Sequence, residues 1–297
     1  GVDSLEVICL HSEDVPDALK DGWLKPSDDG RYFHLDIGAA PKSQYLNQQS
    51  FTFIDLFAGI GGFHQALESL GGQCVLACEK DIKARRVYSA QFPELFEGGV
   101  EEDVERVFPS DIRTITLSEK AEDRSPEEIC QLVPDHDVLC AGFPCQPFSK
   151  SGAQQGVKDQ VRGTLFFDLL QIIGARKPKY IFLENVSNLA GPKHRDTWKT
   201  IIRALREYNY IVHDQPLVLS PHTIPPQLGG APQTRTRVFI LAIRRDEGFI
   251  DRNHILFTKE DLPEFAKSTW DIRAIIDERL NDEEKYRLSS ETEAWLR

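Results

Sequence analysis

Three features are missing from this sequence of 297 residues. It has no methionine, not even at position 1, so we expect Gly1 to be a processed end or a tag remnant. It has no apolar run long enough to span a bilayer, and its acidic N-terminus lacks the apolar core of a secretory signal. We therefore expect a cytoplasmic protein with no membrane partner.

An excess of positive charge is also missing. The chain has 35 Lys+Arg against 47 Asp+Glu, a net charge of −12. A protein that binds nucleic acid usually carries a basic surface. If this one does, its basic residues are concentrated on one face, or a basic segment lies outside this chain.

Cysteine is present but sparse, with six residues in the whole chain. Three of them lie in or beside apolar, strand-like runs, which indicates reduced thiols rather than a disulfide framework. Cys74 and Cys78 are four residues apart, but no second Cys or His pair matches them, which argues against a zinc site.

From residue 51 onward, strand-like and helical patterns alternate, which is typical of a mostly parallel sheet with helices on both faces. Residues 1–50 contain only short apolar pieces interrupted by polar residues, Pro and Gly, which indicates a small N-terminal extension. The segment 94–134 is acidic, and we expect it to be irregular. The expected strands cover 51–56, 73–78, 136–141, 180–183 and 238–243, and we expect 210–219 to be extended. The expected helices cover 61–70, 82–92, 163–175 and 197–207.

Residues 142–149 read Gly-Phe-Pro-Cys-Gln-Pro-Phe-Ser and directly follow an expected strand. Proline fixes φ and donates no backbone hydrogen bond, so the chain must leave the strand here as a rigid loop. The carboxyl end of a strand is where an open α/β sheet presents reactive groups. Cys145 is therefore a candidate nucleophile, the alternative being one more buried thiol.

Residues 55–62 read Asp-Leu-Phe-Ala-Gly-Ile-Gly-Gly, a strand followed by a glycine loop and a helix. Glycines let the backbone turn tightly and let a ligand approach the loop and the helix N-terminus. Glu79 follows the next expected strand, 20 residues after Gly59. A carboxylate there could hold the ribose hydroxyls of NAD or of S-adenosylmethionine, and the spacing does not separate the two.

Both strings resemble motifs of the DNA (cytosine-5)-methyltransferases of the bacterial modification type. The resemblance covers residues 51–243, with the motifs in family order, and more loosely the expected helical tail 246–297. It implies an α/β fold of the Rossmann-like class I methyltransferase type, with 51–297 as the catalytic domain. It also implies S-adenosylmethionine as cofactor, S-adenosylhomocysteine as product, and no metal.

The resemblance assigns roles in the cofactor site. Phe57 would pack on the adenine or its sugar, and Gly59 and Gly61 would admit the methionine moiety. Asp111 would accept a hydrogen bond from the adenine amino group.

Glu79 and Asp111 also have a simpler interpretation, as solvated turn carboxylates. Residues 162–167 read Arg-Gly-Thr-Leu-Phe-Phe, which resembles another family motif. It implies a helix start that places Leu165 beside the cofactor.

The chemistry of the family needs a thiolate, because C5 of cytosine is a poor nucleophile until addition at C6 makes it enamine-like. The resemblance implies that Cys145 supplies this thiolate. Glu184, in the string Glu-Asn-Val at the end of another expected strand, would donate to N3 and accept from the exocyclic amine. The alternative is a glutamate that caps the next loop.

Residues 233–237 read Gln-Thr-Arg-Thr-Arg and lead into the last clear strand, where alternation would put Arg235 and Arg237 on one face. In the family, the arginines of this motif face the cytosine O2 and a nearby phosphate. We assign Arg237 to the base and keep Arg235 as a second candidate, with two surface arginines as the alternative.

Two family features are not visible before Arg297: a target-recognition domain and a final Asn-containing motif. We therefore expect a fragment that holds the core catalytic domain. The polar segment 149–160 resembles the family's closing loop, and a flipped base requires such closure.

The sequence thus predicts methyl transfer from S-adenosylmethionine to C5 of a flipped-out cytosine in duplex DNA. We expect a monomer, associated with the nucleoid in a bacterium, that acts alone or beside a separate cognate restriction endonuclease. The alternatives are a tRNA cytosine-5 methyltransferase, a silent regulator with the same fold, and an NAD-dependent dehydrogenase. Intact Cys145, Glu184 and Arg237 argue against the regulator, and a dehydrogenase has no use for the Pro-Cys-Gln-Pro loop.

Overall fold

The computed structural model describes residues 50–96, 104–144, 164–224 and 230–245, together with two short strands nearer the N-terminus. These two strands, β1 (Leu24–Pro26) and β2 (Phe33–Leu35), pair antiparallel. No helix in the described part is both long and apolar enough to cross a membrane.

Three predictions fall outside the described residues and are not addressed by the structure. They concern Cys145, the polar segment 149–160 and the tail 246–297.

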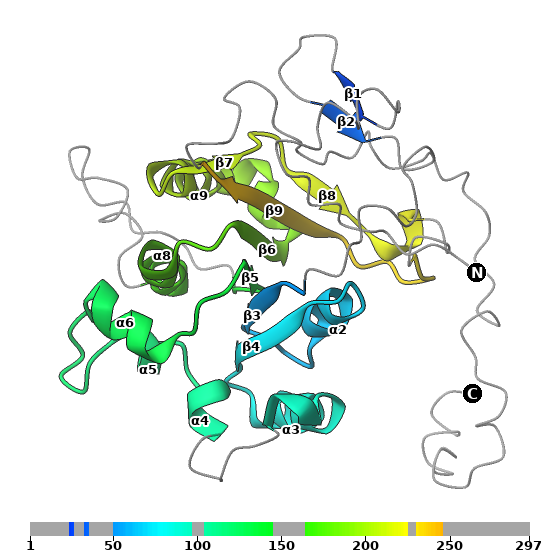
Figure 1. The fold of residues 1–297 in the computed structure, drawn as a ribbon. Helices are drawn as coiled ribbons and strands as arrows, with labels where there is room; N and C mark the ends of the chain where they lie inside the picture. Colours follow the sequence, from blue (N-terminus) through cyan, green and yellow to red (C-terminus); the bar gives the residue numbers. More distant parts are fainter. Residues whose placement is uncertain are drawn as a thin grey trace, which may run out of the picture.

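A seven-stranded sheet lies at the centre of the protein, in the order β4-β3-β5-β6-β9-β7 with β8 paired to β9 (Figure 1). The strands are β3 (Thr52–Leu56), β4 (Gln73–Cys78), β5 (Val138–Ala141), β6 (Tyr180–Val186), β7 (Tyr210–Val212), β8 (Leu217–Leu219) and β9 (Arg237–Arg244). Strands β4, β3, β5 and β6 are parallel, whereas β9 runs antiparallel to β6, β7 and β8. The mostly parallel, Rossmann-like sheet expected from the sequence is confirmed.

The four predicted helices of the core are present. They are α2 (Gly62–Glu68), α3 (Ile82–Gln91), α8 (Leu165–Arg176) and α9 (Arg195–Glu207). Three short 3-10 turns also occur near the later strands: η3 (Ser187–Ala190), η4 (Pro192–His194) and η5 (Pro221–Thr223). The extended stretch 210–219 consists of two separate strands, β7 and β8.

The prediction of an irregular segment over 94–134 was wrong. Its described part contains η1 (Pro93–Phe96), α4 (Val104–Val107), α5 (Arg113–Thr116) and α6 (Pro126–Leu132). Helix α6 begins with a capping box, in which the Ser125 side chain accepts from the Glu128 amide and the Glu128 side chain accepts from the Ser125 amide. Proline at the first helical position favours the same start.

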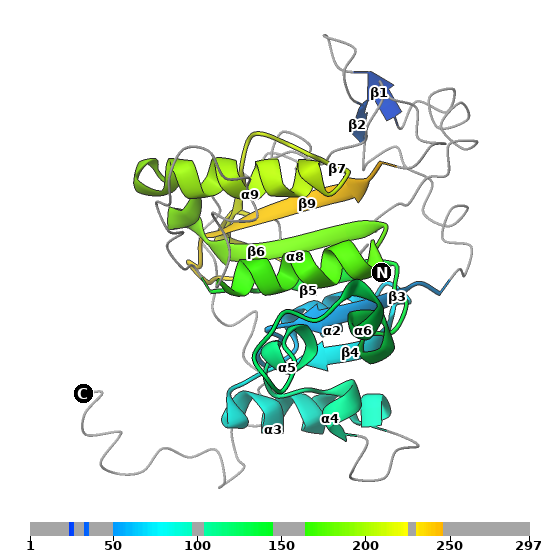
Figure 2. The same cartoon turned by 90° about the vertical axis from the view of Figure 1, so that its left-hand side faces the viewer.

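Alternate side chains of the sheet face two different layers. Ile54 of β3 and Leu139 of β5 belong to the main core, which α8 and α9 cover. Phe53 and Cys140, at neighbouring positions of the same strands, pack instead with Leu67 of α2. Figure 2 shows α8 and α9 over one face of the sheet, and in Figure 1 α2 lies on the other. Helices on both faces, as predicted, leave the strand ends as the place for a site.

The chain changes direction across the sheet between β3 and β5. These strands are hydrogen-bonded neighbours, but the chain first leaves β3 to form β4 on its other side. In open α/β sheets, ligands bind outside the carboxyl ends of the strands at such a switch point. Here that place is bordered by residues 57–61 after β3 and 142–144 after β5.

Candidate functional site

The carboxyl ends of β3, β4 and β5 are joined by backbone hydrogen bonds. The amide of Ala58 donates to the carbonyl of Cys78 at 3.0 Å, and the amide of Gly142 donates to the carbonyl of Leu56 at 3.2 Å. The loop after β3 is therefore held between the ends of its two neighbours, so the glycine loop and the start of the Pro-Cys loop lie at one edge.

The loop from β3 to α2 has an unusual backbone. Phe57, Gly59 and Gly61 have φ values of 57°, 58° and 94°, all in the left-handed region. A Cβ at residue 61 would also lie 2.1 Å from the ring of Phe92, so this position requires glycine. A non-glycine residue in this region, as at Phe57, costs about 1 kcal/mol or more, and such strain clusters at ligand sites.

Glu79 lies at the end of β4, against this loop. Its Oε2 accepts from the Gly59 amide at 2.8 Å, and its Oε1 accepts from the Asp81 amide at 2.6 Å. The two bonds fix the carboxylate at the mouth of the glycine loop. Each carboxylate oxygen has a second lone-pair direction, so Glu79 keeps the capacity to accept from two ribose hydroxyls.

Asp111 lies close by, just before α5. Its Oδ2 accepts from Lys80 Nζ at 2.8 Å and its Oδ1 from the Arg113 amide at 3.0 Å. Partial burial opposes ionisation, but the Lys80 ammonium and the Arg113 amide together hold the pKa of Asp111 below its usual range. Asp111 is therefore an ionised acceptor, as an adenine amino group would require, although Lys80 already occupies one oxygen.

Leu165 is the first residue of α8, whose N-cap Thr164 accepts from the Phe167 amide. Leu165 is half-buried against the main core. The next residue, Phe166, packs its ring against Phe143 in the loop after β5, with centroids 5.5 Å apart. The helix start thus borders the same edge as the glycine loop, where the sequence placed Leu165.

The Glu79 carboxylate gives the first testable prediction. We expect Glu79→Ala to raise the Kd for S-adenosylmethionine about 10- to 100-fold, because hydrogen bonds to a charged group contribute about 1.5–3 kcal/mol. Titration calorimetry on the folded variant measures this change. Glu68→Ala is the matched control, since Glu68 is an exposed carboxylate at the far end of α2. An unchanged Kd would make Glu79 a turn carboxylate only.

Glu184 and Arg237 form an ion pair at the ends of β6 and β9. The distance from Arg237 Nε to Glu184 Oε1 is 2.6 Å, and each side chain is 22% exposed. The antiparallel register pairs Val186 with Arg237, which brings the arginine diagonally over Glu184. The structure thus joins two candidate catalytic side chains that are 53 residues apart (237 − 184).

The Glu184 carboxylate also reaches the Pro-Cys loop. A Cβ built on Gly142 would lie 3.6 Å from Glu184 Oε2, so the carboxylate lies against the loop three residues before Cys145 (145 − 142).

Arg235 is not part of this arrangement. Strand β9 begins at Arg237, so the alternation expected to put both arginines on one face does not extend to Arg235. Its side chain is exposed, and its backbone amide donates to Ser220 Oγ at 3.1 Å.

Asn185 is a residue that the sequence analysis did not single out. It is 3% exposed, and its Nδ2 donates to the carbonyl of Phe143 at 2.7 Å. Its Oδ1 accepts from the Val186 amide. The side chain therefore ties the end of β6, which carries Glu184, to the loop two residues before Cys145. The available signal in the sequence was a polar residue directly after a catalytic candidate at the end of an expected strand.

We expect Asn185→Ala to lower kcat about 10²-fold, since a displacement of about 1 Å between reacting groups can have that effect. The Kd for the cofactor should change little, because Asn185 contacts neither the glycine loop nor Glu79 among the described residues. Steady-state kinetics measures kcat, titration calorimetry measures the cofactor Kd, and thermal unfolding measures the stability of the variant. Asn188→Ala, an exposed asparagine in η3, is the control. A fall in thermal stability with normal kcat would show that Asn185 only supports the fold.

Three cysteines in the described part, the half-buried Cys74 and the buried Cys78 and Cys140, are poor nucleophiles. Burial raises the pKa of Cys74 and of Cys78 to about 12. Burial also raises the pKa of Cys140, which is fully enclosed, well above its usual range. A thiol needs its thiolate form to react, so these three side chains are structural.

Comparisons with known proteins identify sequence relatives of this chain. A profile of the C-5 cytosine-specific DNA methylase family matches residues 51–294. The type II methyltransferase M.AluI of Cellulosimicrobium cellulans is 45% identical over 192 residues, which are 65% of this chain and 33% of that protein. M.HhaI of Haemophilus parahaemolyticus is 39% identical over 194 residues, 65% of this chain and 49% of that protein.

A solved structure of a Spodoptera frugiperda DNMT2 mutant is 25% identical, with a TM-score of 0.46, over 71% of this chain and 56% of its own. The matched part of this chain spans between a third and a half of the length of the two methyltransferases M.AluI and M.HhaI. The family profile nevertheless covers most of it, including every motif named above. The chain belongs to the C-5 cytosine-specific DNA methylase family.

Proposed function

We propose that this chain transfers a methyl group from S-adenosylmethionine to C5 of a flipped-out cytosine in duplex DNA. The observation that carries the proposal is the ion pair of Glu184 and Arg237 against Gly142, at the start of the loop that bears Cys145. A carboxyl group and a guanidinium beside the start of the loop that contains a candidate nucleophile match the needs of covalent catalysis on a pyrimidine.

The cofactor would be held at the switch point by the glycine loop and two carboxylates. Glu79 would accept from the ribose hydroxyls and Asp111 from the adenine amino group, with Phe57 and Leu165 as apolar neighbours. Gly59 has open space where a side chain would lie, which leaves room for the methionine moiety, whereas the ring of Phe92 occupies that position at Gly61. When bound, the cofactor supplies the electrophilic methyl group.

The reaction begins at Cys145, whose thiolate forms a bond to C6 of the cytosine. The electron pair of the C5–C6 double bond moves toward N3, where Glu184 in its protonated form donates a proton. Protonation ends the ion pair of Glu184 with Arg237, which leaves the guanidinium to stabilise the developing charge at O2. C5 then takes the methyl group. A base, for which water suffices, removes the C5 proton, and the C6–sulfur bond breaks to release the Cys145 thiolate. The proton on N3 returns to Glu184, which leaves neutral 5-methylcytosine.

Duplex DNA is the proposed substrate because the named relatives are type II methyltransferases. The direct test offers radiolabelled S-adenosylmethionine with unmethylated duplex DNA and, separately, with tRNA, and counts the transferred methyl groups. Transfer to DNA is expected. Transfer to tRNA alone would overturn the choice of substrate, and transfer to neither, with the cofactor bound, would show that these 297 residues do not suffice for catalysis. The monomeric state, the restriction partner and the division at residue 50 stay predictions.

A further inference from the structure

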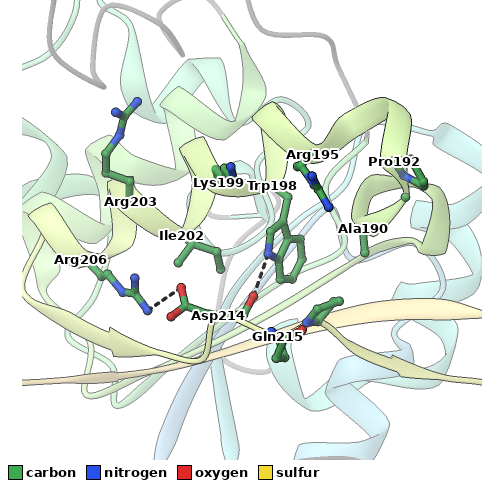
Figure 3. A pocket seen from close by; sticks show the side chains of 12 residues that line it. Ala190, Pro192, Arg195, Trp198, Lys199, Ile202, Arg203, Arg206, Asp214 and Gln215 are labelled. Atoms are coloured by element: carbon green, nitrogen blue, oxygen red, sulfur yellow. Dashed lines mark hydrogen bonds and ion pairs between the residues drawn. The ribbon is translucent and has the colours of Figure 1, made fainter.

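A groove of about 660 Å³ lies beside α9, away from the residues described so far. Figure 3 shows its lining, with Trp198 and Ile202 from the helix facing Asp214 and Gln215 in the turn before β8. Trp198 Nε1 donates to the Asp214 carbonyl at 3.0 Å, which fixes the turn against the helix. The groove is therefore a built feature of the fold.

Cations follow the groove along α9. Arg195, Lys199 and Arg203 are exposed lining residues spaced four apart, so they come from successive turns of the helix (Figure 3). At a rise of about 1.5 Å per residue, each step is about 6 Å and the row spans about 12 Å. Among the described residues that line the groove, Asp214 is the one carboxylate, and Arg206 neutralises it at 3.0 Å.

This row of positive charges contrasts with the chain as a whole, whose net charge is −12. Like charges four residues apart on a helix destabilise it. In the described part of the protein, neither Arg195 nor Lys199 has an ion pair that would offset this repulsion. A ligand with negative charges repeated at similar intervals would offset it.

The groove starts at the edge of the sheet that carries the proposed active site. Strand β6 ends at Val186, and η3 follows without a break, so Ala190 of the groove lies six residues after Glu184 (190 − 184). The cationic row then runs from Arg195 away from this edge. A polymer that reaches Glu184 can therefore continue along α9.

We propose that the α9 groove binds the sugar–phosphate backbone of the DNA substrate outside the target base. The inference rests on the proposed function. A row of separate cations suits a polyanion better than a single phosphate, which would need its donors to converge on one point. Phosphate contacts of this kind position a protein on the duplex without reading its sequence.

The test compares Arg195→Gln/Lys199→Gln with Arg106→Gln/Lys120→Gln in the 297-residue chain. The control pair removes equal charge from exposed positions in α4 and in the turn after α5, away from α9 (Figure 2). Fluorescence anisotropy gives the Kd for an unmethylated duplex between 50 and 200 mM salt, and calorimetry gives the Kd for S-adenosylmethionine.

Removing one cation that neutralises a phosphate lowers the slope of log affinity against log salt by about 1. The groove variant should therefore show a slope smaller by about 2. Between 50 and 200 mM salt, the factor by which its DNA affinity decreases should be about ten times smaller than the factor for the parent. Its cofactor Kd should be unchanged. An unchanged slope, or an equal decrease in the control pair, would overturn the proposal.

A slope change seen with tRNA but not with duplex DNA would also overturn it, because the groove would then serve another polyanion. Failure of the proposed function has a different signature. The parent chain would bind DNA with the predicted salt dependence but transfer no methyl group.

Discussion

Cys145→Ala should abolish methyl transfer to duplex DNA, with a decrease of more than about 10⁴-fold in kcat, and should leave the Kd for S-adenosylmethionine unchanged. The thiol would form the bond to C6, and without that bond C5 is too weak a nucleophile to accept the methyl group. The proposed cofactor residues lie elsewhere, Glu79 after β4 and Asp111 just before α5, so their contacts should survive.

The matched control for this variant is Cys130→Ala. Cys130 is a half-buried cysteine of α6 whose Sγ contacts the Ala175 carbonyl, on a helix remote from the Glu184 carboxylate. It should retain full turnover. Turnover by Cys145→Ala at more than a few per cent of the parent would remove the proposed nucleophile, whereas a weakened cofactor affinity would point to a misfolded loop.

Glu184→Gln should lower kcat by about 10²- to 10⁴-fold, the range for losing a general acid. The amide keeps the size of the side chain and can still contact N3, but it cannot transfer a proton. Cofactor affinity should change little, because Glu184 contacts Arg237 and lies against Gly142 rather than against Glu79 or Asp111. Single-turnover kinetics with saturating DNA isolates the chemical step.

Glu207→Gln, an exposed glutamate at the end of α9, controls for the removal of one negative charge. A Glu184→Gln rate within about threefold of the parent would assign Glu184 to holding Arg237 rather than to proton transfer.

The sequence predicts the central sheet well because its strands carry strong local signals. The bounds of β4 at Gln73–Cys78 agree with the prediction, and β6 contains the predicted strand and extends it to Val186. These buried parallel strands are short apolar runs bounded by turn residues. Helix α9 was placed to within two residues at its start, since its apolar face has regular spacing.

Short helices were missed for a physical reason. Helices α4 and α5 have four residues each, too few for a period of 3.6 to be visible. The start of α6 did carry a signal, the string Ser-Pro-Glu-Glu at 125–128, which the acidic composition of the segment hid.

The contacts between side chains of the candidate site could not be predicted from local sequence patterns. The ion pair of Glu184 with Arg237 depends on the antiparallel register of β6 and β9, and no local pattern specifies that register. The bond from Asn185 to the Phe143 carbonyl joins two strand ends in the same way. Motifs named the candidate side chains, whereas tertiary structure decides which of them meet.

One measurement tests the covalent mechanism most directly. A duplex with 5-fluorocytosine at its target cytosines is incubated with the protein and S-adenosylmethionine, because fluorine at C5 leaves no proton to remove and blocks release of the enzyme. We predict a protein–DNA complex that survives denaturation. Mass spectrometry should find the DNA attached to the peptide that contains Cys145. Cys145→Ala should form no such complex. A methylated duplex without any covalent complex, or attachment at another residue, would contradict the account.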